Sequence, residues 1–165
     1  MKSTLSIIVL LTWLNLAHTQ PEYKSDKLGS LSFGYIYNSW ENAIKDFHIL
    51  EIEYVQTKYE SGHHYFDISK YAGIEIGLNT NKFTIGPKFG TTINLWGIIF
   101  GAEIVTYTDF NEATLRIAPV IGFGNHKYII SLVPQIGILN RDFLPTNQGQ
   151  LNIAIRLIDL KKEEN

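Results

Sequence analysis

Carboxylates and histidines are the side chains of this sequence whose spacing could support chemistry. Glu51 and Glu53 stand at positions i and i+2, which places both carboxylates on one face of a β-strand. Paired carboxylates can serve as general acid and base, although two glutamates on one strand are weak grounds for a catalytic site. His63 and His64 look like a metal-binding dipeptide, but neighbouring strand residues point to opposite faces. With no third ligand beside them, we predict no metal site.

Two further classes of motif are absent. No Gly-x-Ser-x-Gly sequence is present to form a serine nucleophile elbow. The segment Gly122-Phe-Gly-Asn125 is followed by neither Lys-Ser/Thr nor a helical pattern, so it does not form a phosphate loop. We therefore predict no catalytic residue and no cofactor, and we expect a protein that is not an enzyme.

The charged residues occur within stretches of period two, which is typical of β-strands. Between residues 97 and 107, one face would carry Ile98, Phe100, Ala102 and Ile104, and the other Ile99, Gly101, Glu103 and Val105. Residues 112–124 and 150–160 repeat the pattern. One face is apolar throughout, and the other is small and polar with a charge near mid-strand. A closed sheet in a bilayer needs this sidedness, because its outer face meets lipid and its interior is polar.

The chain after residue 20 can be divided into eight such strands. They run over about residues 28–38, 47–59, 64–79, 82–96, 97–108, 112–124, 127–139 and 150–160. Most are longer than a globular strand of about five or six residues, and a tilted membrane strand needs about 9 to 11. The pattern predicts an all-β fold, an eight-stranded antiparallel up-and-down transmembrane β-barrel.

The inward faces of these strands carry polar residues that the barrel would enclose. The set comprises Glu51, Glu53, Glu75, Lys88, Glu103, Arg116, Gln135 and Arg156. An eight-stranded barrel is just wide enough for side chains to fill, and buried charges must pair or titrate. We interpret the set as a structural network that fills the lumen. A narrow polar pore and a pocket for a small ligand are the alternatives.

Three prolines fall in the middle of predicted strands. Pro87, Pro119 and Pro134 share an apolar-x-Pro-x-apolar-Gly frame. Proline has no N–H for a ladder hydrogen bond and is normally kept to edges or bulges. The sequence therefore predicts three bulges, or strands whose middles are irregular.

Aromatic residues make up 13% of the chain and gather toward the strand ends, where membrane barrels carry two interfacial girdles. The predicted girdle residues are Tyr35, Tyr37, Trp40, Phe47, Tyr59, Tyr65, Phe66, Phe83, Trp96, Tyr107, Phe110, Phe123, Tyr128 and Phe143. An aromatic-rich soluble core would require the opposite sidedness, with the aliphatic stripe inside and the charges outside.

The N-terminal residues have the pattern of a secretory signal peptide. Lys2 precedes an apolar run over about residues 5–16, and Ala17-His18-Thr19 forms a small-x-small site before Gln20. Cleavage after Thr19 would leave 13 basic and 16 acidic residues, a net charge of −3. The cleaved chain would therefore have no excess of positive charge with which to bind nucleic acid. The chain has no cysteine, so burial or sheet closure must stabilise it. We predict a signal peptide over 1–19, a barrel over 20–160 and a polar tail over 161–165.

From about residue 28 to residue 160 the chain resembles the small eight-stranded outer-membrane barrels of the outer-membrane protein A and X type. The resemblance rests on the leader, the eight amphipathic strands and interior residues such as Glu103, Arg116 and Arg156. Gly86-Pro87-Lys88 and Tyr107-Thr108-Asp109 also resemble elements of uncharacterised small barrels. Those barrels usually end in an aromatic residue, whereas this last strand reaches Leu160 and continues into charged residues. The resemblance implies an outer-membrane location and no known active site.

We therefore expect an outer-membrane protein with a structural or adhesive surface role. Its strands would meet outer-membrane lipid, and its loops over residues 39–46 and 140–149 would meet any extracellular partner. A soluble periplasmic barrel or sandwich that binds a small apolar ligand is the alternative. A lipid-modifying barrel enzyme is a third candidate, which no residue selects.

Overall fold

The computed structural model describes residues 25–39, 46–60, 66–80, 82–143 and 149–163, and every regular element in them is a β-strand. The strands are β1 (Ser25–Asn38), β2 (Phe47–Glu60), β3 (Phe66–Gly77), β4 (Ile85–Leu95), β5 (Ile98–Thr108), β6 (Ala113–Gly124), β7 (Tyr128–Leu132), β8 (Ile136–Leu139) and β9 (Gln150–Glu163). Among the described residues, no helix is long and apolar enough to span a membrane.

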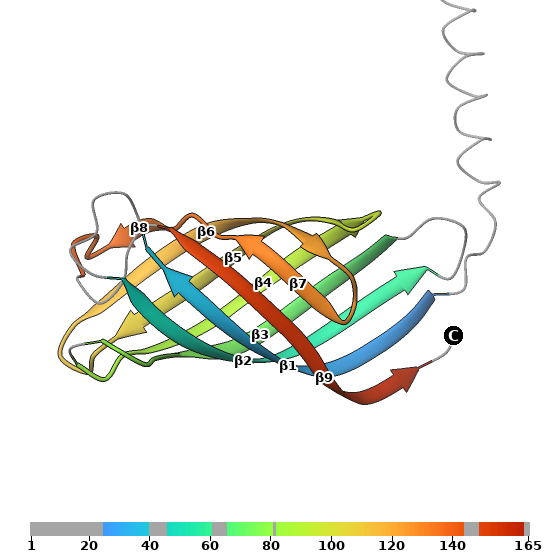
Figure 1. The fold of residues 1–165 in the computed structure, drawn as a ribbon, viewed down its shortest axis with the longest axis horizontal. Coiled ribbons are helices and arrows are strands. Elements are labelled where there is room, and N and C mark those ends of the chain that lie inside the picture. Colours follow the sequence, from blue (N-terminus) through green and yellow to red (C-terminus); the bar gives the residue numbers. More distant parts are fainter. Residues whose placement is uncertain (1–24, 40–45, 61–65, 81, 144–148, 164–165) are drawn as a thin grey trace, which may run out of the picture.

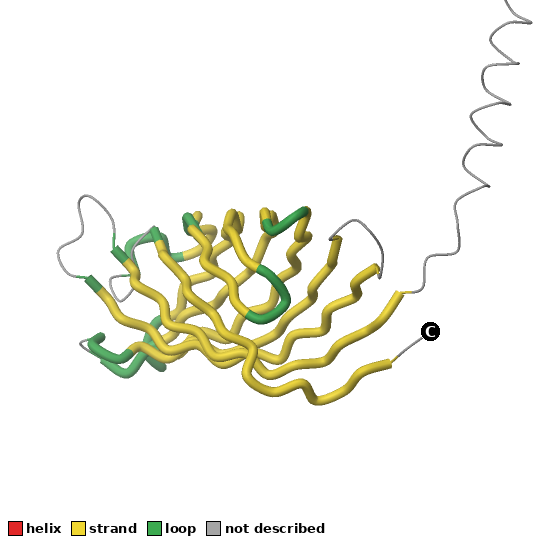
Figure 2. The backbone as a smooth tube through the Cα atoms, turned by 45° about the vertical axis from the view of Figure 1, so that its right-hand side comes forward, coloured by secondary structure: helices red, strands yellow, loops and turns green. Residues whose placement is uncertain are grey.

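The strands close into an antiparallel barrel (Figures 1 and 2). Each strand from β1 to β6 pairs with the next one along the chain, and β9 completes the ring by pairing with both β7 and β1. β7 and β8 together occupy the place of the predicted seventh strand, and both pair with β6. The predicted closed barrel of eight antiparallel strands is therefore confirmed, with one strand divided in two.

The two ends of the barrel carry different connections. The loop end carries the connections after β1, β3, β5 and β8, and the turn end carries those after β2, β4 and β6 together with the start of β1. β3 and β4 are shorter than the sequence predicts, whereas β9 runs to Glu163 and so includes part of the predicted polar tail. The predicted signal peptide, residues 40–45 and residues 144–148 lie outside the described residues.

Pro119 on β6 and Pro134 between β7 and β8 lie at the same level of the sheet. Two flanking pairs set this level, Ile121 with Leu132 and Ile117 with Ile136. No bridge joins β6 to the facing strand between these pairs. The sequence predicts an irregular strand middle at such prolines, and Pro134 provides one.

The backbone around Pro134 explains why the break falls there. The Val133 amide donates to the Gln150 carbonyl on the β9 side at 2.9 Å. Because successive residues of a strand bond to opposite neighbours, the nitrogen of Pro134 is directed toward β6. Neither Pro134 nor Pro119 has an N–H to give, so this position of the ladder has no backbone donor on either side.

Pro87 is accommodated without a bulge, and the ladder shows the other predicted outcome, a strand whose middle is irregular. The β4–β5 ladder has no bridge at residues 86 and 87, yet Ile85 pairs with Thr108 and Lys88 pairs with Val105. The number of residues between these pairs is the same on both strands, and the register is therefore kept. The register shifts that do occur lie at residues 29–32 of the β1–β9 pair and 115–116 of the β6–β8 pair.

Burial follows the predicted alternation, with polar residues inside and large apolar residues outside. On β6, Thr114, Arg116 and Ala118 are buried, whereas Ile117, Ile121 and Phe123 are exposed. β9 repeats this arrangement, with Asn152 and Ala154 buried between the exposed Leu151, Ile153 and Ile155. The interior of the barrel is thus more polar than its outer surface.

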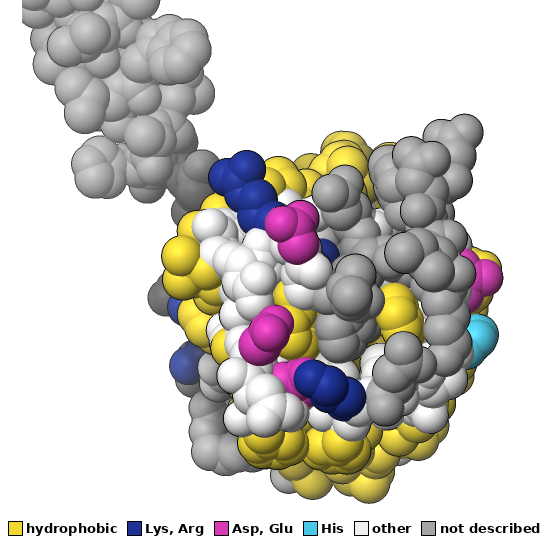
Figure 3. All heavy atoms as spheres, turned by 90° about the vertical axis from the view of Figure 1, so that its left-hand side faces the viewer, with side chains coloured by type: hydrophobic (Ala, Val, Ile, Leu, Met, Phe, Trp, Pro, Cys, Tyr) yellow, Lys and Arg dark blue, Asp and Glu magenta, His cyan; other side chains and the backbone are white. Residues whose placement is uncertain are grey.

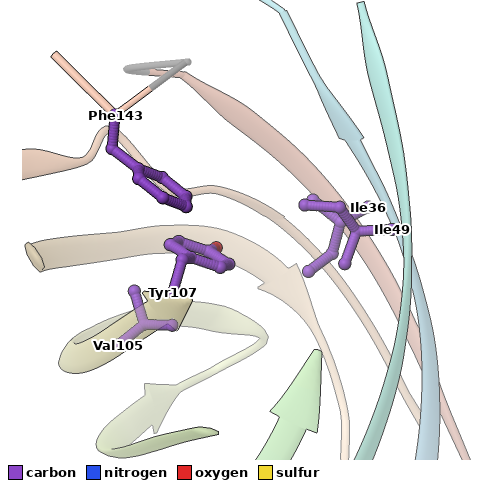
Figure 4. Close-up of a cluster of buried hydrophobic side chains, with 5 residues drawn as sticks. All are labelled: Ile36, Ile49, Val105, Tyr107 and Phe143. Carbon is purple, nitrogen blue, oxygen red and sulfur yellow. The ribbon is translucent and has the colours of Figure 1, made fainter. Parts of the chain in front are cut away.

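Three of the aromatic residues predicted for the girdles lie inside instead. Phe47, Tyr107 and Phe143 are buried, and the last two belong to an apolar cluster in the lumen (Figure 4). Tyr107 shares the inward parity of Glu103, so the prediction that it belongs to a girdle, which rests on its place near the strand end, is wrong. Of the other predicted aromatics, Tyr35, Tyr37, Phe83, Trp96, Phe110, Phe123 and Tyr128 are exposed.

Candidate functional site

A single buried lysine holds four glutamates together at the middle of the lumen. Lys88 of β4 lies with its Nζ 3.0 Å from Glu53 Oε1, 3.2 Å from Glu75 Oε1 and 3.5 Å from Glu103 Oε2. It also forms a short ion pair and hydrogen bond with Glu51. All five side chains are buried. We call these residues the Lys88 cluster.

Glycines make room for this cluster in a narrow barrel. Each of its four glutamates has a glycine as a direct cross-strand neighbour: Gly34 for Glu51, Gly73 for Glu53, Gly86 for Glu75 and Gly90 for Glu103. A Cβ on Gly73 would lie 2.7 Å from Glu53 Cγ, and one on Gly86 would lie 2.6 Å from the Tyr107 ring. The lumen of an eight-stranded barrel is barely wide enough for its side chains, so these positions exclude even a methyl group.

Neutral donors complete the shell around the carboxylates. Tyr71 donates to Glu103 Oε2 at 3.0 Å, and Asn152 Nδ2 donates to both oxygens of Glu51 at 3.0 and 3.3 Å. Tyr107 donates to Glu75 and accepts from the amides of Gln135 and Gln150 at 2.9 and 2.7 Å. The sequence prediction named Gln135 but missed Tyr71, Tyr107, Gln150 and Asn152, although strand parity places all four on the inward face.

The two predicted arginines lie on opposite sides of the cluster. Arg116 is buried on the loop-end side, where its Nη2 donates to the Phe143 carbonyl at 3.4 Å. Arg156 lies toward the turn end and donates to Thr57 Oγ1 at 2.9 Å and to Ser69 Oγ at 3.1 Å. All eight residues of the predicted network therefore lie inside the barrel, and five of them meet at Lys88.

An apolar layer lies between the cluster and the loop end. It consists of Ile36, Ile49, Val105, Tyr107 and Phe143, whose side chains converge in the lumen (Figure 4). Three of these residues lie two positions nearer the loop end than a residue at the level of the cluster: Ile36 relative to Gly34, Ile49 relative to Glu51, and Val105 relative to Glu103. Seen from the loop end, hydrophobic side chains form much of the rim, and acidic, basic and other polar side chains also lie at this end (Figure 3). The five side chains therefore form an apolar layer inside the lumen between the Lys88 cluster and the loop end.

A cavity of about 40 Å³ lies on the other side of the cluster. Its inner lining includes Glu53, Lys88 and Glu103, and its outer lining includes the exposed Lys127 of the β6–β7 turn. The cavity therefore extends from the cluster toward the turn end. One water molecule needs roughly 10–15 Å³ of cavity volume, so the cavity has room for about three water molecules.

The charge of the Lys88 cluster sets what it can do chemically. Four carboxylates face one ammonium group, and an isolated buried charge costs several kcal/mol. The excess negative charge must therefore be balanced by protons or by a further cationic group. Among the described residues, no group of three His, Cys, Asp or Glu side chains is placed to hold a metal ion.

The loop end carries a smaller charged site, built from residues that connect the strands. Lys82 Nζ donates to Asp109 Oδ2 at 2.9 Å, and the amides of Asn111 and Glu112 donate to Asp109 Oδ1 at 3.0 and 2.8 Å. These donors, led by Lys82, lower the pKa of Asp109 to about 2. Beside this pair the rings of Phe83 and Phe110 stack at 6.0 Å. The arrangement joins the β3–β4 and β5–β6 connections.

Comparison of the chain with protein-family models, with curated proteins and with solved structures finds no match.

Proposed function

We propose that this chain is an outer-membrane β-barrel protein with a structural or adhesive surface role. The observation that carries the proposal is the sidedness of the barrel. Large apolar side chains such as Ile153, Ile121 and Phe89 are 43%, 51% and 60% exposed, while the lumen contains the Lys88 cluster. An outer surface of this kind is stable against hydrocarbon and costly against water.

The dimensions of the strands support insertion. The shortest uninterrupted strands, β4 and β5, have 11 residues each. At a rise of about 3.3 Å per residue and a tilt of about 45°, 11 residues span about 26 Å. The apolar band of a membrane barrel is about 25 Å tall. The strands are thus long enough to cross a bilayer.

Exposed aromatic residues at both ends of the barrel also favour this reading. Phe83 and Phe110 lie at the loop end, and Trp96 and Phe123 lie at the turn end. Aromatic rings are enriched at both interfaces of a membrane, where an apolar body and a polar edge are both accommodated. Two such groups, one at each end of the barrel, match two interfacial girdles.

The polar lumen counts against the soluble alternative, a barrel that encloses an apolar ligand. Such a ligand would need an apolar interior, whereas the cavity here is lined partly by Glu53, Lys88 and Glu103. The apolar layer of the lumen also disfavours an open polar channel. The sidedness of the barrel instead supports a role in the membrane or at its surface.

Membrane fractionation tests the proposal, followed by electrophoresis of unboiled and boiled samples. We expect the protein in the outer-membrane fraction, with an unboiled band that migrates differently from the boiled one. Ile153→Arg should lower the free energy of unfolding in lipid by about 2–4 kcal/mol if that position is near the bilayer midplane. Asn111→Arg, in an exposed turn, is the matched control and should be nearly neutral. Recovery of the wild-type chain solely in the soluble fraction would contradict the proposal.

A further inference from the structure

Three lysines form a basic patch on the outer wall of the barrel near its turn end. Lys27 of β1 is half-buried there, and Lys58 of β2 and Lys70 of β3 are exposed. Among the outward side chains that the structure describes on β1 to β8, these are the only Lys, Arg, Asp or Glu residues. We call them the lysine patch. The patch is thus a local exception in a wall that otherwise carries no formal charge.

The register of the strands brings the three lysines together. Lys27 lies directly opposite Lys58 on the β1–β2 pair, and like charges directly opposite each other are destabilising. Lys70 lies opposite Gln56, two residues from Lys58, which makes Lys58 and Lys70 diagonal neighbours on one face. None of the three lysines forms an ion pair with a described carboxylate. A bound anion would therefore relieve the repulsion within the patch.

Uncharged polar groups extend the patch along the sheet. Gln56 and Thr91 lie on either side of Lys70 in the same row of paired residues. A Cβ on Gly29, which lies opposite Gln56, would be 2.8 Å from the Tyr54 hydroxyl, so this hydroxyl lies beside the same row. The amide of Gln56 and the phenol of Tyr54 can both donate hydrogen bonds. Neutral donors therefore accompany the ammonium groups.

The positions at the strand tips leave the positive charge in excess. Toward the turn end, the register places Lys161 opposite Gly29 and Glu163 opposite Lys27. Glu60 follows Lys58 by two residues on β2. These positions add one lysine and two glutamates to the three lysines of the patch, so four basic residues stand against two acidic ones.

The level of the patch is that of a membrane interface if the barrel lies in a bilayer. β1 and β2 have 14 residues each and extend at the turn end beyond the β6–β7 turn (Figure 1). Lys70 is four residues from the start of β3, which is about 9 Å along the barrel axis at a tilt of about 45°. A lysine side chain at such a depth can extend its ammonium group to the interface.

We propose that the lysine patch binds the headgroup of an anionic phospholipid, an inference that rests on the proposed function because it needs the wall to face a bilayer. Phosphate oxygens accept charge-assisted hydrogen bonds from lysine ammonium groups. Farther from the turn end, Ile52 and Ile74 pair with each other on the same strands and would lie beside the acyl chains. A zwitterionic lipid carries its own ammonium group, which the lysines would repel. The patch therefore favours a headgroup with a net negative charge.

The test is native mass spectrometry of the folded chain in a non-ionic detergent. The chain is titrated with dioleoyl phosphatidylglycerol and with dioleoyl phosphatidylcholine, which share their acyl chains and differ in headgroup charge. We expect the first phosphatidylglycerol molecule to bind at least about fivefold more tightly than phosphatidylcholine. Equal affinity for the two lipids would overturn the proposal. Binding of glycerol 3-phosphate as tight as that of phosphatidylglycerol would also overturn it, because the patch would then be a site for a soluble anion.

Matched lysine variants locate the site. The double variant Lys58→Gln, Lys70→Gln replaces two exposed side chains and should reduce the preference for phosphatidylglycerol to less than about twofold. Lys127→Gln is the control, an exposed lysine at the same end of the barrel. It follows β6, which three strands separate from β2 in either direction around the ring. This control should keep the wild-type preference, and an equal loss in both variants would contradict the assignment to the lysine patch.

Failure of this inference can be told apart from failure of the proposed function. A wild-type chain that is recovered in the outer-membrane fraction but binds both phospholipids equally would refute the lipid site alone. A wild-type chain that is recovered solely in the soluble fraction would refute the lipid site together with the proposed function.

Discussion

Gly73 of β3 lies directly opposite Glu53 of β2, and the space that its missing side chain leaves is filled by the glutamate. A Cβ at residue 73 would lie 2.5 Å from the Ile52 carbonyl oxygen and 2.7 Å from Glu53 Cγ. The first of these atoms belongs to the backbone of a paired strand and cannot move away cheaply. The same pairing of glycine with glutamate recurs on four strand pairs, so the lumen is packed around its charges.

Replacing Gly73 by alanine should therefore destabilise the barrel. Overpacking of this kind typically costs about 1–3 kcal/mol, measured as the free energy of unfolding in a urea titration followed by tryptophan fluorescence. Ala72→Leu is the control, because Ala72 is one residue away and exposed on the outer face. It should change stability by less than about 0.5 kcal/mol. Equal effects of the two substitutions would contradict the packing described for the lumen.

Lys88→Met should be more damaging than any exposed lysine substitution. Removal of one partner from a buried ion pair typically costs about 3–5 kcal/mol, because the opposite charge is left uncompensated. Lys82→Met, which removes a 60% exposed side chain from an ion pair, should cost about 0–1 kcal/mol. Adding Glu51→Gln to Lys88→Met should recover part of the loss in the same urea titration. A Lys88→Met variant as stable as wild type would mean that the glutamates do not depend on this lysine.

Because Pro119 and Pro134 face each other without an N–H, replacing both should change hydrogen exchange at these two positions. In the double variant Pro119→Ala, Pro134→Ala, both positions gain an N–H, and the ladder between β6 and the β7–β8 strand can close. We expect the new amides at residues 119 and 134 to exchange slowly with solvent deuterium, as in the neighbouring strand, when followed by NMR. Rapid exchange at both positions would show that the absence of bridges between β6 and the β7–β8 strand has a cause other than the missing N–H donors.

The loop-end ion pair predicts a dependence of stability on pH. The pKa of Asp109 is lowered to about 2, below its ordinary value of about 3.9. A carboxylate with a lowered pKa contributes its full stabilisation above the ordinary value and loses it as the pH falls through the lowered one. The thermal midpoint of wild type should therefore exceed that of Asp109→Asn at pH 6, and the difference should shrink toward pH 2.

Asp142→Asn is the control for that experiment, because it removes an exposed carboxylate from a neighbouring loop. The midpoint of this variant should stay close to that of wild type at both pH values. A difference between wild type and Asp109→Asn that stays constant from pH 6 to pH 2 would contradict the lowered pKa.

Strand alternation is the part of the fold that the sequence predicts well. Glu103 and Val105 are buried and Phe100 is exposed, as period two requires. This pattern is local, because each side chain of a strand lies on the face opposite to its neighbours. Parity alone places all eight residues of the predicted network inside the barrel.

The meeting of five of those residues at Lys88 could not be predicted in this way. Which inward residues lie at one level depends on the register of every strand pair, such as Gly73 with both Glu53 and Lys88. Phe143 lies in a connection where parity has no meaning, so its place in the lumen comes from tertiary packing. Tyr107 is different, because its parity with Glu103 predicts an inward side chain, whereas its place near a strand end wrongly predicts an interfacial one.

The outward face of β9 offers a direct test of whether the barrel lies in lipid. Because the chain has no cysteine, a single nitroxide label can be attached at Ile153→Cys, with Asn111→Cys in the exposed turn as reference. In lipid vesicles, we expect the label at 153 to collide with dissolved oxygen far more often than with a water-soluble nickel chelate, and the label at 111 to do the reverse. Nickel collisions at 153 as frequent as those at 111 would show that this face meets water, and would contradict a barrel in lipid.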